Sequence, residues 1–268
     1  MLLINTEIKE NLKLPYLALL VGMFAISTSA ILIRYSNSEP LVIGTYRQAF
    51  ATLAFLPFIF KDRGAEISSQ SNSTLLEMAL TGILLGAHFS FFITSVKETS
   101  VAASVLLATC HVVYVAILGK IFFGETLSKK AIIGTTIALG GILVLFGGDL
   151  IDNPGNFKGN FYAFVAGVLA GLYYLSGRKL RRTISLPTYA FVVYFFSFIS
   201  MFTVVLIQNL NYENLPISEI RLFLLMALIP TLLGHTMQNW AIGYLPAYVV
   251  SISLLAEPIG SGLLALVF

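Results

Sequence analysis

The chain has 268 residues, of which 57% are hydrophobic and 11% are charged, and its formal net charge is +3. Because soluble globular domains carry about 25% charged residues, this composition excludes an ordinary soluble domain and indicates a membrane protein. The small positive charge comes from Lys and Arg in predicted loops, so we expect no nucleic-acid partner. Cys110 is the only cysteine, which excludes an intramolecular disulfide and a multi-cysteine metal site.

Apolar segments long enough to cross a bilayer follow one another along the chain. A hydrocarbon core of about 30 Å needs about 20 apolar residues in a helix. Nine segments of about this length are predicted as spans, at residues 15–33, 40–60, 74–96, 100–122, 130–147, 158–178, 187–208, 220–243 and 247–268. The first is longer than the apolar core of a signal peptide and lacks a cleavage site, so we expect it to remain as a span. The sequence therefore predicts an all-α, polytopic membrane helix bundle.

The basic residues predict the orientation of the bundle. With the N-terminus in the cytoplasm, eleven of the sixteen Lys and Arg residues fall on the cytoplasmic side: Lys9, Lys13, Lys61, Arg63, Lys120, Lys129, Lys130, Arg178, Lys179, Arg181 and Arg182. Cytoplasmic loops of membrane proteins carry an excess of Lys and Arg. We therefore expect the N-terminus to be cytoplasmic.

The chain contains an internal repeat of matched hydropathy and loop position. A shift of 146 residues places 84–118 on 230–264 without a gap, and His111 then falls on Glu257. Each repeat has five helices, and an odd number inverts the second copy in the membrane, as is typical of secondary transporters. The predicted repeats are 1–148 and 149–268. The second stops after four helices, so we expect nine helices of a ten-helix fold, with the last one missing.

Four segments carry a resemblance to a known family. They are YRQAFATLAFLP at 46–57, ASVLLATCHVVYVAILGKIFFGETLS at 103–128, GHTMQNWAIGYLPA at 234–247 and LLAEPIGSGLLA at 254–265. In order and spacing they resemble the EamA-type branch of the drug/metabolite transporter superfamily. The resemblance implies a carrier of the inner membrane that moves small solutes by alternating access, through a cavity between the first four helices of each repeat. It also implies a homodimer supported by the fifth and tenth helices.

Polar side chains inside the spans are the candidate site residues, because a charged group at the bilayer centre costs about 2.5–3.5 kcal/mol on insertion scales. Arg47 offers a planar fork of donors that suits a carboxylate or phosphate of a substrate. Alternatively, it pairs with a carboxylate or helix-end carbonyls, or extends to the interface. Glu257, beside Pro258, lies too deep to reach the interface. A neutral carboxyl there suits a proton carrier, and a structural hydrogen bond to a neighbouring helix is the alternative.

The three histidines of the chain all lie within predicted spans. His88, His111 and His235 could contact substrate, and an imidazole can take up a proton near neutral pH. We assign proton coupling to His235 together with Glu257. The alternative for each histidine is a hydrogen bond to a carbonyl or hydroxyl group between helices. We expect no metal and no cofactor, since no two histidines share a span at i, i+4 spacing.

The eighth span ends in a polar stripe. His235, Gln238 and Asn239 fall at i, i+3 and i+4 on one helical face, which must contact protein or water rather than lipid. We predict that Asn239 contacts substrate and that three aromatic residues, Tyr173, Tyr174 and Trp240, form the wall of the cavity. The spacings Gly82-x-x-x-Gly86 and Gly167-x-x-x-Gly171 predict close helix packing.

These features predict a secondary active transporter and not an enzyme. Its partners are the lipid bilayer and a small organic solute, which is a metabolite, an amino acid or a drug. Export coupled to protons or to exchange is the leading hypothesis. A membrane-embedded enzyme is the first alternative, although no HExxH, GxSxG or paired-Asp motif is present. A channel is the second, although no filter segment is recognisable.

Overall fold

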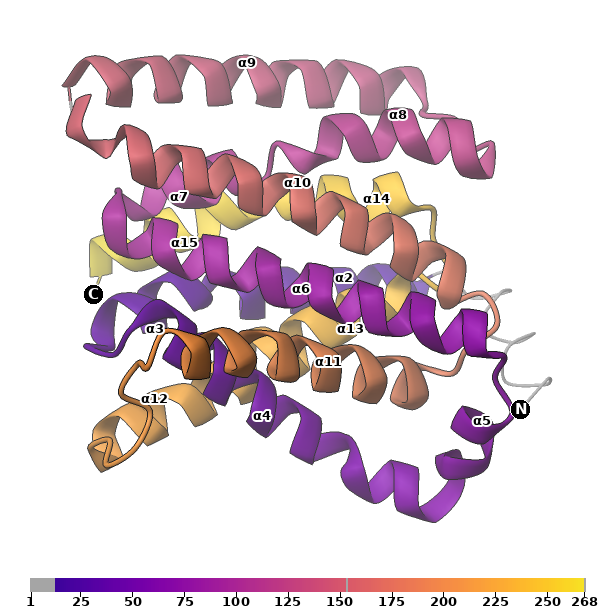
Figure 1. The fold of residues 1–268 in the computed structure, drawn as a ribbon. Coiled ribbons are helices and arrows are strands. Elements are labelled where there is room, and N and C mark those ends of the chain that lie inside the picture. The colour runs from indigo at the N-terminus through magenta and orange to yellow at the C-terminus, as the bar shows by residue number, and fades with distance from the viewer. Residues whose placement is uncertain (1–12, 153, 268) are drawn as a thin grey trace.

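The computed structural model of the protein describes residues 13–152 and 154–267, and Lys9 and Phe268 of the predictions above lie outside them. The described residues form nine helical rods in an all-α bundle, one for each predicted span (Figure 1). In chain order the rods are α2 (Lys13–Ser27) with α3 (Ser29–Tyr35), α4 (Pro40–Phe58), α6 (Asn72–Glu98), α7 (Val101–Ala108) with α8 (His111–Phe123), α9 (Lys129–Asp152), α10 (Phe157–Leu180), α11 (Leu186–Ile207), α12 (Ile217–Met226) with η3 (Ala227–His235) and α13 (Thr236–Ala241), and α14 (Ala247–Ser253) with η4 (Leu254–Ala256) and α15 (Glu257–Val267). The predicted fold class is confirmed.

Within the described residues, seven of these rods are long and apolar enough to cross a membrane. They are Lys13–Tyr35, Pro40–Lys61, Asn72–Glu98, Val101–Phe123, Leu186–Ile207, Ile217–Ala241 and Ala247–Leu264. The loops that follow α4, α8, α10 and α13 lie at one end of the bundle, on the right of Figure 1. We call this end the basic end, because Arg63, Arg178, Arg181 and Arg182 meet there. The helix α9 lies at the edge of the bundle, beside α8 and α10.

Local sequence signals explain where several helices begin and end. Ser71 and Ser100 accept hydrogen bonds from backbone N–H groups three residues later, which caps α6 and α7. Pro40 begins α4, where its missing N–H would have had no partner in any case. Gly124 ends α8 with a φ of 67°, a left-handed conformation that glycine adopts without a steric penalty. These boundaries are therefore set by residue chemistry and not only by hydropathy.

Two rods are interrupted at matching positions of the predicted repeats. The fourth rod breaks after Ala108 and resumes at His111, and the ninth passes through a 3-10 turn and resumes at Glu257. The eighth rod contains a π-helical segment around Pro230, as expected where proline removes a backbone donor and its ring crowds the preceding turn. Several of the predicted spans are thus chains of short helices.

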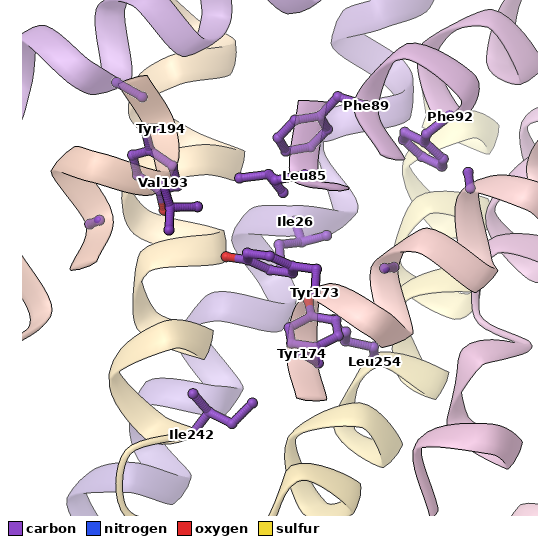
Figure 2. Close-up of a cluster of buried hydrophobic side chains, with 14 of the residues drawn as sticks. Ile26, Leu85, Phe89, Phe92, Tyr173, Tyr174, Val193, Tyr194, Ile242 and Leu254 are labelled. Atoms are coloured by element: carbon purple, nitrogen blue, oxygen red, sulfur yellow. The ribbon is translucent and has the colours of Figure 1, made fainter. Parts of the chain in front are cut away.

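The core lies where the two predicted repeats meet. Figure 2 shows Ile26 of α2 and Leu85 of α6 close to Tyr173 of α10, with Tyr194 of α11 nearby. Tyr173 and Tyr194 are 1% and 0% exposed. Aromatic and aliphatic side chains from both predicted repeats therefore fill the middle of the bundle.

The two glycine spacings lie at close helix contacts, which confirms the packing prediction. A Cβ atom on Gly82 of α6 would lie 2.6 Å from the carbonyl oxygen of Val193 in α11. A Cβ atom on Gly167 of α10 would lie 2.7 Å from the carbonyl oxygen of Ala108. Small residues at these positions let the helix backbones approach each other.

Gly82→Ala should lower the thermal stability of the protein, because the added methyl group would press on the α11 backbone and overpacking costs about 1–3 kcal/mol. Gly134→Ala is the matched control, since a Cβ atom there meets nothing within 4 Å. The apparent Tm in detergent should fall for Gly82→Ala and stay unchanged for Gly134→Ala. An equal effect of the two substitutions would contradict the packing argument.

Candidate functional site

A small enclosed cavity lies between the two predicted repeats. Its volume is about 30 Å³, which is room for a water molecule or two and not for an organic solute. The first repeat contributes walls from α2, α6 and the break before α8, and the second contributes walls from α10, η3 and the start of α15. The lining residues are Ile26, Ser29, His88, Phe89, Phe92, Ala108, Thr109, His111, Ala170, Tyr174, His235, Leu254 and Glu257.

Five of the predicted site residues line this cavity, namely His88, His111, Tyr174, His235 and Glu257. The rings of His88 and His235 have centroids 6.4 Å apart, and the ring of His111 stacks on that of Tyr174 at 5.6 Å. Sequence reasoning placed these residues on five different spans. The structure brings them to one place.

Hydrogen bonds to backbone carbonyls orient two of the histidines. His88 Nδ1 lies 2.9 Å from the carbonyl oxygen of Ala166, and His111 Nδ1 lies 2.8 Å from that of Ala108. Since a carbonyl oxygen only accepts, each Nδ1 donates, which fixes the tautomer of the neutral ring. Nε2 of His111 and Nδ1 of His235 are buried and have no hydrogen-bond partner among the described residues. These two nitrogens are available to a molecule in the cavity.

His111 and Glu257 occupy equivalent places. Each is the first residue of the second half of an interrupted helix, α8 and α15 respectively, and the 146-residue shift aligns them. A carboxylate at a helix N-terminus is favoured by the helix dipole, whereas an imidazolium is not. At the same position beside the cavity, the first repeat therefore places an imidazole and the second a carboxyl group. The helix dipole attracts a negative charge at this position and repels a positive one.

Arg47 lies beside the cavity and is fully buried, at 0% exposure. Its Nε donates to Thr231 Oγ1 at 2.6 Å, and a terminal nitrogen donates to Ser29 Oγ at 3.0 Å. Its guanidinium carbon lies 4.2 Å from the centroid of the Phe89 ring. In the described part of the chain, no carboxylate lies within the 4.0 Å of an ion pair, and the other terminal nitrogen has no hydrogen-bond partner. Its positive charge is held by hydroxyl groups and an aromatic ring.

Tyr173 and Asn239 belong to a buried network next to the cavity. The Tyr173 hydroxyl donates to Asn239 Oδ1 at 2.7 Å, and Asn239 Nδ2 donates to the Tyr194 hydroxyl at 3.4 Å. The Tyr194 and Thr236 hydroxyls are 2.9 Å apart. Neither Tyr173 nor Asn239 is among the residues that line the cavity. The network joins α10, α11 and α13 behind its wall.

The predicted polar stripe of the eighth span is buried, but its members face different neighbours. His235 lines the cavity, and its ring lies 5.1 Å from that of Phe89 in α6. Asn239 contacts α10 and α11. Gln238 lies beside Gly22 of α2, because a Cβ atom on that glycine would lie 3.3 Å from Gln238 Nε2. The stripe therefore contacts protein on three sides, since other helices surround α13.

Trp240 lies away from the cavity, at the basic end. It borders a different pocket, which also includes Arg181 and Gly243, and its ring packs on Tyr244 at 5.1 Å. The structure therefore does not bring Trp240 together with the other predicted site residues. Adjacent residues of an α-helix point about 100° apart around its axis, so Trp240 faces away from the network that the neighbouring Asn239 contacts.

Two carboxylates for which the sequence predicted no role join helices to each other, one at each end of the bundle. At the basic end, Glu66 accepts hydrogen bonds from Ser185 N at 2.9 Å and from the Ser185 and Thr188 hydroxyls at 2.5 and 2.7 Å. At the other end, Glu219 accepts from the Ser36 and Ser38 hydroxyls at 2.5 and 2.8 Å and from Asn37 N at 3.0 Å. Each carboxylate joins the two predicted repeats.

Glu66 stays charged at neutral pH. Burial raises the pKa of its carboxyl group, but hydrogen bonds from Ser185 and Thr188 and the charge of Arg63 outweigh that effect and hold the pKa below its usual value. A lowered pKa in the folded state means that the contact stabilises the fold above the ordinary pKa of glutamate and is lost as the pH falls through the lowered value.

Glu125 forms a third contact of this kind, in an FFGETLS segment whose glutamate had no predicted role. Its Oε1 accepts from Arg178 Nε at 2.8 Å, and its Oε2 accepts from Ala247 N, the first residue of α14, at 2.8 Å. The two side chains are 7% and 13% exposed. A motif quoted for its resemblance to a family thus contains a buried ion pair that fixes the start of α14. Among the described residues, no three of His, Cys, Asp and Glu cluster as a metal site would require.

Comparison of the sequence with known proteins identifies a family and two relatives that resemble this chain. The sequence model of the EamA-like transporter family matches residues 13–147 and 157–268. An uncharacterized transporter of Archaeoglobus fulgidus is 28% identical over 148 residues, which are 55% of this chain and 51% of that protein. An uncharacterized transporter of Helicobacter pylori is 23% identical over 163 residues, which are 59% of this chain and 52% of that protein. The chain thus spans about half the length of the curated relatives it matches.

A solved crystal structure shares the fold. It superposes with a TM-score of 0.74 over 94% of this chain and 88% of that one, at 18% sequence identity. At this identity the likeness concerns the arrangement of the helices alone.

Arg47→Met and Arg178→Met should have different effects on the thermal stability of the protein. Replacing Arg47 removes a buried charge that no carboxylate compensates, so thermal stability should hold or rise, whereas replacing Arg178 leaves Glu125 buried without its cation and should cost about 3–5 kcal/mol. The apparent Tm of each variant in detergent is the measurement. A loss for Arg47→Met as large as that for Arg178→Met would show that Arg47 is a structural residue.

Proposed function

The chain belongs to the EamA-like transporter family, and on that premise we propose that it is a secondary active transporter that exports a small organic solute by alternating access. The observation that carries the proposal is the convergence of His88, His111, Tyr174, His235 and Glu257 on one cavity between the predicted repeats. Secondary transporters built from inverted repeats place substrate and coupling ion at such an interface, beside interrupted helices. We assign residues 1–148 and 149–268 to the two repeats.

The cavity must enlarge before it can hold a solute, because its volume is about 30 Å³. The breaks before His111 and Glu257 are the points at which α7 can move relative to α8, and α14 relative to α15. Arg47, which contacts Ser29 and Phe89 of the cavity wall, becomes accessible when the wall moves. Its guanidinium fork suits a solute with a carboxylate or phosphate group, such as an amino acid or another acidic metabolite.

The carboxylates at the two ends act as gates in this proposal. Glu66 reaches from the first repeat to the start of α11, and Glu219 reaches from α12 to the loop before α4. The two contacts lie at opposite ends, and each one joins the two repeats. Breaking the Glu219 contacts while those of Glu66 persist opens one side, and the reverse opens the other. We place the basic end in the cytoplasm, by the excess of positive charge.

Proton coupling is assigned to Glu257 and His235, which line the same cavity. A carboxyl group and an imidazole can each bind a proton in one state of the cavity and release it in the other. The edge helix α9 exposes Ile132, Ile133 and Ile137. We assign the predicted homodimer contact to this face of α9.

Counterflow in proteoliposomes tests the transporter assignment. Vesicles loaded with one candidate solute at millimolar concentration should accumulate its labelled form from outside transiently and saturably, because a carrier exchanges bound solute across the membrane. Arg178→Met, which leaves Glu125 at the start of α14 without its cation, should lose exchange, whereas Lys130→Gln at an exposed position should retain it. Sustained electrical current without saturation would instead indicate a channel.

The pH dependence of transport tests the coupling residues. In Glu257→Gln combined with His235→Ala, export driven by a pH gradient should fall by about tenfold or more, a loss of at least about 1.4 kcal/mol of coupling, while exchange without a gradient persists. The rates would be measured in proteoliposomes over a range of pH. Unchanged pH dependence in the double variant would remove both residues from the coupling mechanism.

A further inference from the structure

A second cavity lies at the basic end, and it shares no lining residue with the first. Its volume is about 560 Å³, within the range of known small-molecule sites. Four arginines line it, together with Trp240 of the eighth span and Tyr244 of the loop that follows: Arg63, Arg178, Arg181, Arg182, Trp240 and Tyr244. Its lining includes the three arginines of the GRKLRR segment and the tryptophan that lies apart from the central cavity.

Only two of the four positive charges are compensated within the described residues. Arg63 lies 3.5 Å from Glu66, and Arg178 lies 2.8 Å from Glu125. Among the side chains that the structure describes, which do not include that of Asp62, no carboxylate lies within 4.0 Å of Arg181 or Arg182. The cavity therefore holds an excess of positive charge.

The two uncompensated guanidinium groups are held in place by other contacts. Arg181 is 9% exposed, and it donates to the carbonyl oxygens of Asn239, at 3.1 Å, and of Ile184. The guanidinium carbon of Arg182 lies 5.2 Å from the centroid of the Phe123 ring. Carbonyl dipoles and an aromatic face orient a cation, but they do not neutralise it. The excess of basic residues expected in cytoplasmic loops accounts for exposed Lys and Arg, but not for a buried arginine in the wall of a cavity.

We propose that this cavity binds the phosphate of an anionic phospholipid headgroup. A guanidinium group offers two parallel N–H donors that match phosphate oxygens. Basic cavities between membrane helices bind phospholipid headgroups in the same way. Ile184, Leu186 and Pro187 give the cavity an apolar side for the glycerol and the first part of the acyl chains. Trp240 and Tyr244 are the residue types enriched at the depth of the headgroups.

Titration of the purified chain with dioctanoyl phosphatidylglycerol tests the proposal, with native mass spectrometry to count bound lipid and the apparent Tm as a second readout. The wild-type chain should bind one lipid and gain thermal stability. Arg182→Gln should bind about tenfold more weakly, because one charge-assisted phosphate contact is lost. Arg182 is exposed, so this variant should fold, and an unchanged apparent Tm without lipid would verify that.

Lys130→Gln is the matched control, since it removes one exposed positive charge next to the loop that follows α8 and does not line the cavity. It should bind the lipid as the wild type does. Equal weakening in both variants would overturn the proposal in favour of general charge attraction. Equal binding of dioctanoyl phosphatidylcholine would overturn the requirement for an anionic lipid. An equal shift with inorganic phosphate would assign the site to free phosphate instead of a lipid.

Discussion

Hydrocarbon cannot hydrogen bond, and the described part of this bundle meets that constraint by placing its polar groups in three zones. One zone is the middle of the bundle, where Arg47 donates to two hydroxyl groups and the Tyr173 network joins three helices. The other two zones are the ends, where Glu66 and Glu125 accept hydrogen bonds from the starts of α11 and α14, and Glu219 accepts from the loop before α4. Between the zones the helices present apolar faces such as those of Phe24 and Ile137 to the surroundings.

The end contacts and the central cavity depend on each other. Each of the three carboxylates Glu66, Glu219 and Glu125 joins elements that are distant in sequence. Together they connect the ends of helices whose middle parts surround the cavity. The Glu66 contact is in addition sensitive to pH, because its hydrogen bonds hold the pKa of the carboxyl group below its usual value and are lost when the group is protonated.

Hydropathy and spacing predicted the spans because both follow from bilayer thickness and side-chain polarity, and the nine rods agree with them. The 146-residue shift paired His111 with Glu257, and both residues begin a half-helix beside one cavity. The failures have a common cause. Glu66 and Glu219 lie in or next to loops, where a carboxylate is unremarkable in sequence, and their partners are 119 to 183 residues away. Trp240 and Asn239 are adjacent in sequence but face different surroundings, which depends on packing that no periodicity encodes.

The small volume of the central cavity, about 30 Å³, has a consequence for affinity if the protein is the carrier proposed above. A carrier whose empty form has almost no free volume exposes its binding groups only in a minor population, and its apparent dissociation constant is the intrinsic value divided by the fraction that is open. If one molecule in a hundred is open, the affinity falls about a hundredfold. Under the proposed transport function, opening the helices costs the same free energy for every cargo, so a small cavity in the empty form lowers the affinity for all cargoes by one common factor.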